Sequence, residues 1–136
     1  MLSKSARYAI RAMAYVASHQ KDGAVKTCAI ARETDVPPDF LVKVVNRLVQ
    51  EGLLLSRRGA GGGLTLGRPA AEIGVEQVFS LFVELYCEFD ECFWGKATCD
   101  GPCSMHGVWA PAVRGMRRAI EGLTIESLVM QAQESP

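Results

Sequence analysis

The chain has 136 residues, of which 49% are hydrophobic and 22% are charged, a composition that fits one folded domain with a short additional element and excludes a disordered or multi-domain protein. It has no run of about 18 consecutive apolar residues, so we expect no membrane span and a cytoplasmic protein that keeps its N-terminus. The formal net charge is zero, yet residues 1–70 hold eleven Lys or Arg against five Asp or Glu, whereas residues 71–136 hold four against ten. This asymmetry favours a polyanion-binding front half joined to an acidic half with another role.

Apolar residues at helical spacing predict three helices in the basic half. The first covers residues 3–19, and the second is a short helix over residues 27–35 that the Thr27 hydroxyl can cap. The third begins at about Pro38, because proline is well tolerated in the first turn of a helix, and Gly52 ends it. Its apolar positions follow the spacing of one buried stripe, which consists of Leu41, Val44, Val45, Leu48 and Val49. The opposite face of this helix is polar.

After the third helix, two short apolar strands over residues 53–56 and 64–66 flank a glycine-rich turn with Arg57 and Arg58 at its base, a pattern typical of a β-hairpin. Two short helices separated by a tight turn and followed by such a basic hairpin are the parts of a winged helix-turn-helix. In that fold the third helix enters the major groove of DNA and the wing reaches the neighbouring minor groove. The sequence therefore predicts a mainly α fold, with a small β-hairpin wing, that binds double-stranded DNA.

The rest of the chain adds two further parts. Apolar residues at helical spacing over residues 73–85 predict a fourth helix, which completes a DNA-binding domain over residues 1–85. Residues 86–104 are irregular and rich in Cys, Gly and aromatic side chains, and we expect them to form a cofactor-binding loop. Residues 105–136 should hold a long dimerisation helix and a C-terminal tail, because the helix is long enough to pair with a copy of itself in a homodimer. The expected dimer contacts lie on its apolar stripe: Trp109, Val113, Met116 and Ile120.

Polar side chains give this predicted fold its DNA chemistry. Lys43, Asn46 and Arg47 project donors from the polar face of the third helix, and the wing cations can enter the negative potential of a narrow minor groove. Each feature alone is also typical of a solvated helix face or a flexible loop, so it is their order along the chain that favours DNA contact. The candidate DNA-binding residues are Ser3, Lys4, Ser5, Tyr8, Pro37, Asp39, Lys43, Asn46, Arg47, Arg57, Arg58 and Gly62.

The cysteines are unevenly distributed. Cys28 stands alone among apolar residues of the second helix and is predicted to be a small buried hydrophobe. Four more thiols fall within 17 residues and a histidine follows: Cys87, Cys92, Cys99, Cys103 and His106. In a reducing compartment such a cluster is more typical of metal binding or redox sensing than of structural disulfides. Three Cys and one His suit an iron-sulfur cluster or a structural zinc site, a redox-active thiol pair is a third alternative, and the spacing does not discriminate among them.

Four segments resemble the Rrf-two family of bacterial winged-helix transcription regulators: residues 8–13 (YAIRAM), 40–48 (FLVKVVNRL), 56–66 (SRRGAGGGLTL) and 103–109 (CSMHGVW). The resemblance implies a dimeric regulator, not an enzyme, that carries an iron-sulfur cluster on three cysteines before its dimerisation helix. On this sequence Cys92, Cys99 and Cys103 take the three ligand positions, and His106 matches the fourth ligand used by some members. The resemblance leaves a two-iron and a four-iron cluster both open.

The same resemblance implies a repressor that binds a double-stranded DNA operator and responds through the cluster to nitric oxide, iron or redox state. The sequence departs from the family's pattern in two places. Six residues separate Cys92 from Cys99 but only three separate Cys99 from Cys103, and Arg7 stands where some relatives have an acidic ligand.

Alternative functions are a winged-helix regulator that carries a structural zinc ion or senses through a thiol and, more remotely, a small iron-sulfur electron-transfer protein. An electron-transfer protein would not need the basic front half. No paired carboxylates in a plausible pocket, nucleophile with a base, or P-loop is evident, so we expect no catalytic residues.

Overall fold

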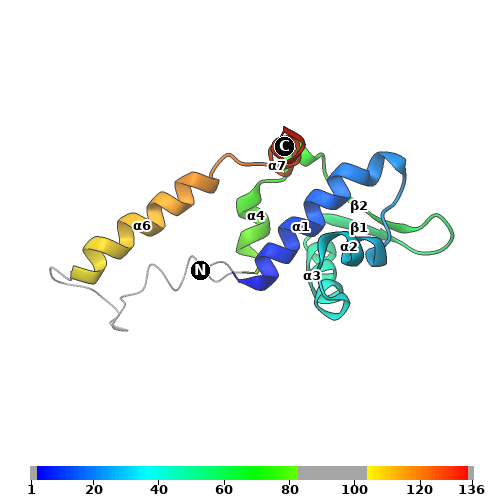
Figure 1. Ribbon diagram of the computed structural model, residues 1–136, viewed down its shortest axis with the longest axis horizontal. Helices are drawn as coiled ribbons and strands as arrows, with labels where there is room; N and C mark the ends of the chain where they lie inside the picture. Colours follow the sequence, from blue (N-terminus) through cyan, green and yellow to red (C-terminus); the bar gives the residue numbers. More distant parts are fainter. Residues whose placement is uncertain (1–2, 83–103, 135–136) are drawn as a thin grey trace.

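The computed structural model describes residues 3–82 and 104–134, which Figure 1 traces in sequence colours. These residues are mainly helical with one two-stranded antiparallel hairpin, which confirms the predicted fold class. Within these two ranges no helix is long and apolar enough to cross a membrane. In chain order the elements are α1 (Lys4–His19), η1 (Gln20–Asp22), α2 (Thr27–Thr34), α3 (Pro38–Gln50), β1 (Leu54–Arg57), β2 (Gly63–Leu66), η2 (Ala70–Glu72), α4 (Val75–Ser80), α6 (Ser104–Ile120) and α7 (Ile125–Glu134).

The first three helices follow the predicted spacing, with one correction at a helix start. α1 is capped by Ser3, whose Oγ accepts a hydrogen bond from the Ala6 N–H at 3.1 Å. α2 begins without a side-chain cap: Thr27 is its first helical residue and Lys26 holds the capping position, so the prediction that Thr27 caps this helix is wrong. Asp35 then takes a left-handed conformation (φ 53°), which ends α2 and turns the chain toward the proline that opens α3.

The hydrophobic core is built around the packing of α1 against α3. The buried face of α1 is lined mostly by small side chains, and Ala6, Ala9 and Ala12 have no exposed surface. Small side chains let neighbouring elements approach the helix closely, and Leu41 and Leu48 of α3 contribute larger side chains that are also fully buried. The apolar stripe that the sequence predicts for the third helix is therefore the stripe that the core buries.

The wing pairs through β2 with the segment before α2. β1 and β2 pair antiparallel, with Arg57 opposite Gly63. Two further hydrogen bonds join Val25 to Leu64: the Val25 N–H donates to the Leu64 carbonyl at 2.9 Å, and the Leu64 N–H donates to the Val25 carbonyl at 2.8 Å. Gly63 is needed at this crossing, because an added Cβ would lie 2.6 Å from the Val25 carbonyl oxygen. The glycines of the wing therefore permit close backbone packing as well as a tight turn.

The helix predicted over residues 73–85 begins later, at Val75. Ile73 is fully buried in an extended conformation, because the chain here pairs with the segment that follows α6. The Val75 N–H donates to the Leu123 carbonyl at 2.9 Å as part of this pairing. α4 then covers six residues, and the part of the predicted helix beyond residue 82 lies outside the described residues.

The C-terminal helix α7 is not among the predicted elements. The sequence predicts one helix from about Met105 and then a tail, whereas the chain turns at Gly122 (φ 81°) and a second helix returns to pack against α1. Ile125 at the start of α7 is fully buried, and its N–H donates to the Ile73 carbonyl at 2.9 Å. In Figure 1, α7 lies beside α1, whereas α6 extends away from it. Residues that follow α6 therefore complete the core of the N-terminal helices.

Replacing Ile125 with Ala will lower the free energy of unfolding by about 2–5 kcal/mol, because it removes fully buried apolar volume from the core. Met130→Ala on the same helix is the matched control, since Met130 is 58% exposed and its truncation should change stability by no more than about 0.5 kcal/mol. Urea unfolding followed by circular dichroism, at one protein concentration for all variants, measures both. Equal stabilities for the two variants would show that α7 is not part of the cooperative core.

Candidate nucleic-acid interface

The exposed face of α3 lies opposite its four buried apolar residues. Successive residues of a helix are rotated by about 100°, so Asp39, Lys43 and Asn46 fall in one narrow sector of this face, and all three are exposed. Arg47 lies at the edge of the sector and forms an ion pair with Glu51 at 3.3 Å. Both partners are substantially exposed, so the ion pair is weak and the guanidinium can exchange it for a phosphate. The polar donors predicted for the third helix thus lie on the surface away from the core.

An aromatic contact ties α1 to the start of α3. Tyr8 and Phe40 pack edge to face with their ring centroids 6.1 Å apart. The ammonium of Lys43 lies 5.9 Å from the centroid of the Phe40 ring. Each of these contacts is worth about 0.5–1 kcal/mol at an exposed site. Together they hold Lys43 on the α1 side of the exposed polar sector of α3, which we call the recognition face.

The start of α1 offers fewer available donors than the sequence indicates. The Ser3 hydroxyl donates to the Phe82 carbonyl at 3.0 Å while it accepts from the Ala6 N–H, so its one proton is already engaged. Lys4 is exposed, and Ser5 is half-buried, as is Tyr8. In this structure Ser3 acts as a helix cap that also joins α1 to the segment after α4.

The wing presents two cations and a glycine that shapes its turn. Arg57 and Arg58 are both exposed. Gly62, which the sequence places among the DNA contacts, is buried: its N–H donates to the Gly59 carbonyl at 3.0 Å, and an added Cβ would collide with the Arg57 carbonyl oxygen. The turn closes over Gly62, so this residue sets the shape of the wing. Pro37, also a predicted contact, is exposed at the N-cap of α3.

A groove of about 640 Å³ separates α2 from the N-terminal half of α3. Cys28 lines this groove and is exposed, so the prediction that it is a buried hydrophobe is wrong. Only Ile30 of α2 is buried, and Cys28, two residues earlier, lies about 200° around the helix from it. Pro38 and Val42 of α3 line the other wall. A helix of eight residues with one buried side chain gives too little periodicity for the sequence to fix which residues face the core.

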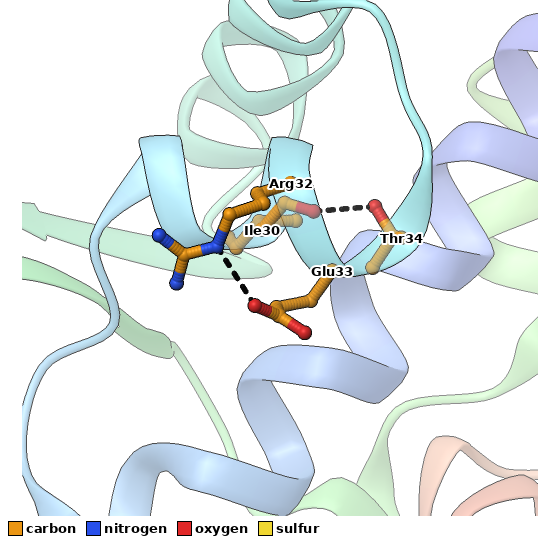
Figure 2. A network of polar contacts seen from close by, with 4 residues as sticks. All are labelled: Ile30, Arg32, Glu33 and Thr34. Carbon is orange, nitrogen blue, oxygen red and sulfur yellow. Dashed lines mark hydrogen bonds and ion pairs between the residues drawn. The ribbon is translucent and has the colours of Figure 1, made fainter.

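The C-terminal end of α2 is held by local polar contacts, which Figure 2 shows. The Arg32 Nε donates to the Glu33 Oε1 at 2.8 Å, and the Thr34 Oγ1 donates to the Ile30 carbonyl at 2.6 Å. The hydrogen bond that Arg32 donates to Glu33, together with the negative charge of that carboxylate, raises the pKa of the Arg32 guanidinium above its ordinary value. Arg32 also lines the groove, so the α2 wall carries a guanidinium as well as the Cys28 thiol.

The predicted metal ligands are not brought together in the described residues. Cys92, Cys99 and Cys103 lie outside those residues, as does Cys87, and His106 lies in the first turn of α6 with its side chain outside the description. Within residues 3–82 and 104–134, no three His, Cys, Asp or Glu side chains gather in a way that could hold a metal ion.

The predicted dimerisation stripe of α6 is divided between two environments. Trp109 and Met116 are 39% and 40% exposed, whereas Val113 is buried and Ile120 packs against the core. Val108, which the predicted stripe does not include, is 71% exposed. The exposed apolar surface of α6 therefore lies toward its N-terminal end and middle, on the part of the helix that extends away from α1 in Figure 1.

Comparisons with known proteins agree with this architecture. The Rrf2 family model, described as iron-dependent transcriptional regulator, matches residues 2–131. The chain is 33% identical over 130 residues to the HTH-type transcriptional regulator IscR of Xenorhabdus nematophila, covering 94% of this chain and 78% of that protein. The solved structure of T. potens IscR superposes with a TM-score of 0.81 at 22% identity, over 98% of this chain and 89% of the other. CymR, the global cysteine regulator of B. subtilis, superposes with a TM-score of 0.80 at 21% identity, over 96% and 97%. The chain therefore belongs to the Rrf2 (Rrf-two) family of helix-turn-helix transcriptional regulators and is a regulator, not an enzyme.

Proposed function

We propose that this regulator acts in the cytoplasm as a homodimeric repressor whose affinity for a double-stranded DNA operator is set by an iron-sulfur cluster. The cluster would be held by Cys92, Cys99 and Cys103, with His106 as the candidate fourth ligand, and would respond to nitric oxide, iron supply or redox state. The observation that carries the proposal is the position of the three thiols in the chain: they follow the winged helix and end directly before α6, which begins at Ser104.

The DNA-binding part of the proposal rests on α3 and the wing. α3 exposes Lys43, Asn46 and Arg47, whose donors suit base edges and phosphates in a major groove. Arg57 and Arg58 are exposed on the wing, where they can neutralise phosphates or enter a minor groove. A two-fold dimer would place its two recognition helices in successive major grooves, about 34–36 Å apart, and would read a rough palindrome.

The donor set fits an iron-sulfur cluster chemically. Thiolates are soft ligands of the kind that iron-sulfur clusters require. Cys103 immediately precedes the first turn of a 17-residue helix, and the unpaired N–H groups and positive dipole end at a helix N-terminus stabilise anionic thiolates. Three Cys and one His also suit zinc, but the family description as iron-dependent favours iron. A bound cluster would supply a centre that can be lost, oxidised or nitrosylated.

The chain offers a physical connection between the proposed cluster ligands and the recognition helix α3. α6 leads through Gly122 into α7, where Ile125 is fixed in the core by burial and by its hydrogen bond to Ile73. α7 packs on α1, and α1 contacts α3 through Tyr8 and Phe40. We hypothesise that a change in order or charge before α6 alters the dimer spacing and reaches the recognition helices along this path.

A thiol-based regulator without metal is the second candidate function, because Cys28 is exposed beside α3. An exposed thiol on α2, next to the recognition helix α3, could be oxidised directly and so sense oxidants. The iron and sulfide bound per chain distinguish the two candidates, because only the cluster-based regulator contains both.

Replacing both Arg57 and Arg58 with Ala will weaken binding to an operator duplex and flatten its salt dependence. Each lost phosphate contact should reduce the slope of log K against log salt by about 0.9. Arg118→Ala, at an exposed position of α6, is the control and should leave the slope unchanged. Fluorescence anisotropy titrations at several salt concentrations measure both variants. An unchanged slope for the double variant would mean that the wing cations do not contact phosphates.

Anaerobic purification should yield a brown protein with sulfide and iron in about equal amounts. The triple variant Cys92→Ala, Cys99→Ala, Cys103→Ala should be colourless, whereas Cys28→Ala should keep the visible spectrum because Cys28 lies on α2, outside the proposed ligand set. A colourless wild type that contains about one zinc per chain would contradict the cluster and indicate a structural zinc site instead. Footprinting titrations then test the switch: equal operator affinity for cluster-loaded and cluster-free protein would contradict it.

Met116→Glu should weaken the dimer by about tenfold or more, because a carboxylate would replace an exposed apolar side chain in the proposed α6 interface. Arg118→Glu is the matched control, since it introduces the same side chain two residues away at an exposed position on another side of the helix. Sedimentation velocity over a concentration series measures both. If Met116→Glu is as dimeric as the wild type, the α6 stripe is not the interface.

A further inference from the structure

The recognition face of α3 contains apolar side chains that the predicted DNA contacts do not include. Phe40 is 49% exposed and Val42 is 51% exposed, and both lie in the N-terminal half of the helix. That half is the part of a recognition helix whose residues reach base edges in helix-turn-helix proteins. The two residues lie on different sides of the polar sector, because they are separated by about 200° around the helix.

The exposure of Phe40 has an explanation within the chain. Its ring packs edge to face against Tyr8 of α1 and lies under the ammonium of Lys43. Phe40 is therefore part of the contact that joins α1 to α3, and it positions a cation. These contacts explain the exposed position of the Phe40 ring without a contact to DNA.

Val42 lies on the other side of the polar sector, toward α2. Helical neighbours are three and four residues apart, so Val42 adjoins the Asp39 side chain in one direction and the Asn46 amide in the other. It also forms part of the wall of the groove between α2 and α3, together with Pro37 and Pro38. Val42 is thus an apolar contact point within a surface whose neighbouring side chains are polar.

The chemistry of the major groove identifies what such a side chain can recognise. Valine has no hydrogen-bond donor or acceptor on its side chain, and the apolar group that base pairs present in the major groove is the C5-methyl of thymine. We infer that Val42 is a specificity-determining residue that packs against a thymine methyl group in each operator half-site. The inference rests on the proposed function of α3 in DNA binding. Asn46, one turn along, can bond adenine N6 and N7, so the pair favours an A·T-containing segment under this part of the helix.

The test uses the purified full-length protein and a duplex selected from a random-sequence pool. Each thymine of the selected site is replaced in turn by deoxyuridine, which removes the methyl group and keeps the hydrogen-bonding edge. One such replacement in a half-site should weaken binding about fourfold, the factor for burial of one methyl group, and replacement in both half-sites should weaken it about sixteenfold. The same replacements should have little effect on the Val42→Ala variant, because its side chain no longer reaches the methyl group.

Phe40→Leu is the comparison variant, since Phe40 lies on the opposite side of the polar sector. It should keep the sensitivity to the same deoxyuridine that Val42→Ala loses. Val42 is half exposed, so thermal melting of Val42→Ala should match the wild type and exclude a folding defect. If the wild type enriches no DNA from the pool, the proposed function itself fails. If it binds DNA but no thymine replacement matters, or Val42→Ala keeps the full sensitivity, the role of Val42 is overturned and DNA binding stands.

Discussion

The alanine face of α1 sets the distances at which the other elements pack. Ala6, Ala9 and Ala12 have no exposed surface, and α1 contacts α2, α3, α4, α7 and β2. A larger side chain at any of these positions would force the neighbouring elements apart, which costs about 1–3 kcal/mol in a well-packed core. Because α3 takes its position from α1, the orientation of the polar recognition face depends on this close packing. The Tyr8–Phe40 contact fixes the same relation at the surface.

The C-terminal part of the chain belongs to this core. Gly74 and Thr124 form an antiparallel bridge, and Ile125 and Ile73 share a hydrogen bond between fully buried residues. α6 therefore emerges from the domain at a fixed point, since the residues after it are anchored. For the proposed regulator this matters physically: a displacement of α6 acts on α7, and α7 lies directly against the helix that supports α3.

The two proposed DNA-contacting elements differ in chemistry. The wing presents the exposed cations Arg57 and Arg58 beside a turn in which Gly62 and Gly63 leave no room for a Cβ. Contacts from such cations to phosphates are electrostatic and independent of base sequence. α3 combines donors with the apolar Val42, a mixture suited to discrimination among base pairs. The groove beside Val42 also exposes Cys28, which places a thiol next to the recognition surface.

The sequence by itself determined the helices and the wing that carry long or distinctive patterns. The stripe of α3, the proline at its start and the glycine-rich hairpin were all predictable, because the buried residues of α3 recur with helical period and the turn needs residues without a Cβ. The exposure of Lys43, Asn46 and Arg47 follows from the same stripe. Only the tertiary structure decided that Cys28 is exposed, that Gly62 is enclosed by its turn, and that residues 125–134 form a helix that packs against α1. These segments are short, and their environment is set by neighbours distant in the sequence: α1 and Ile73 determine the face that α7 buries, and no local period encodes that contact.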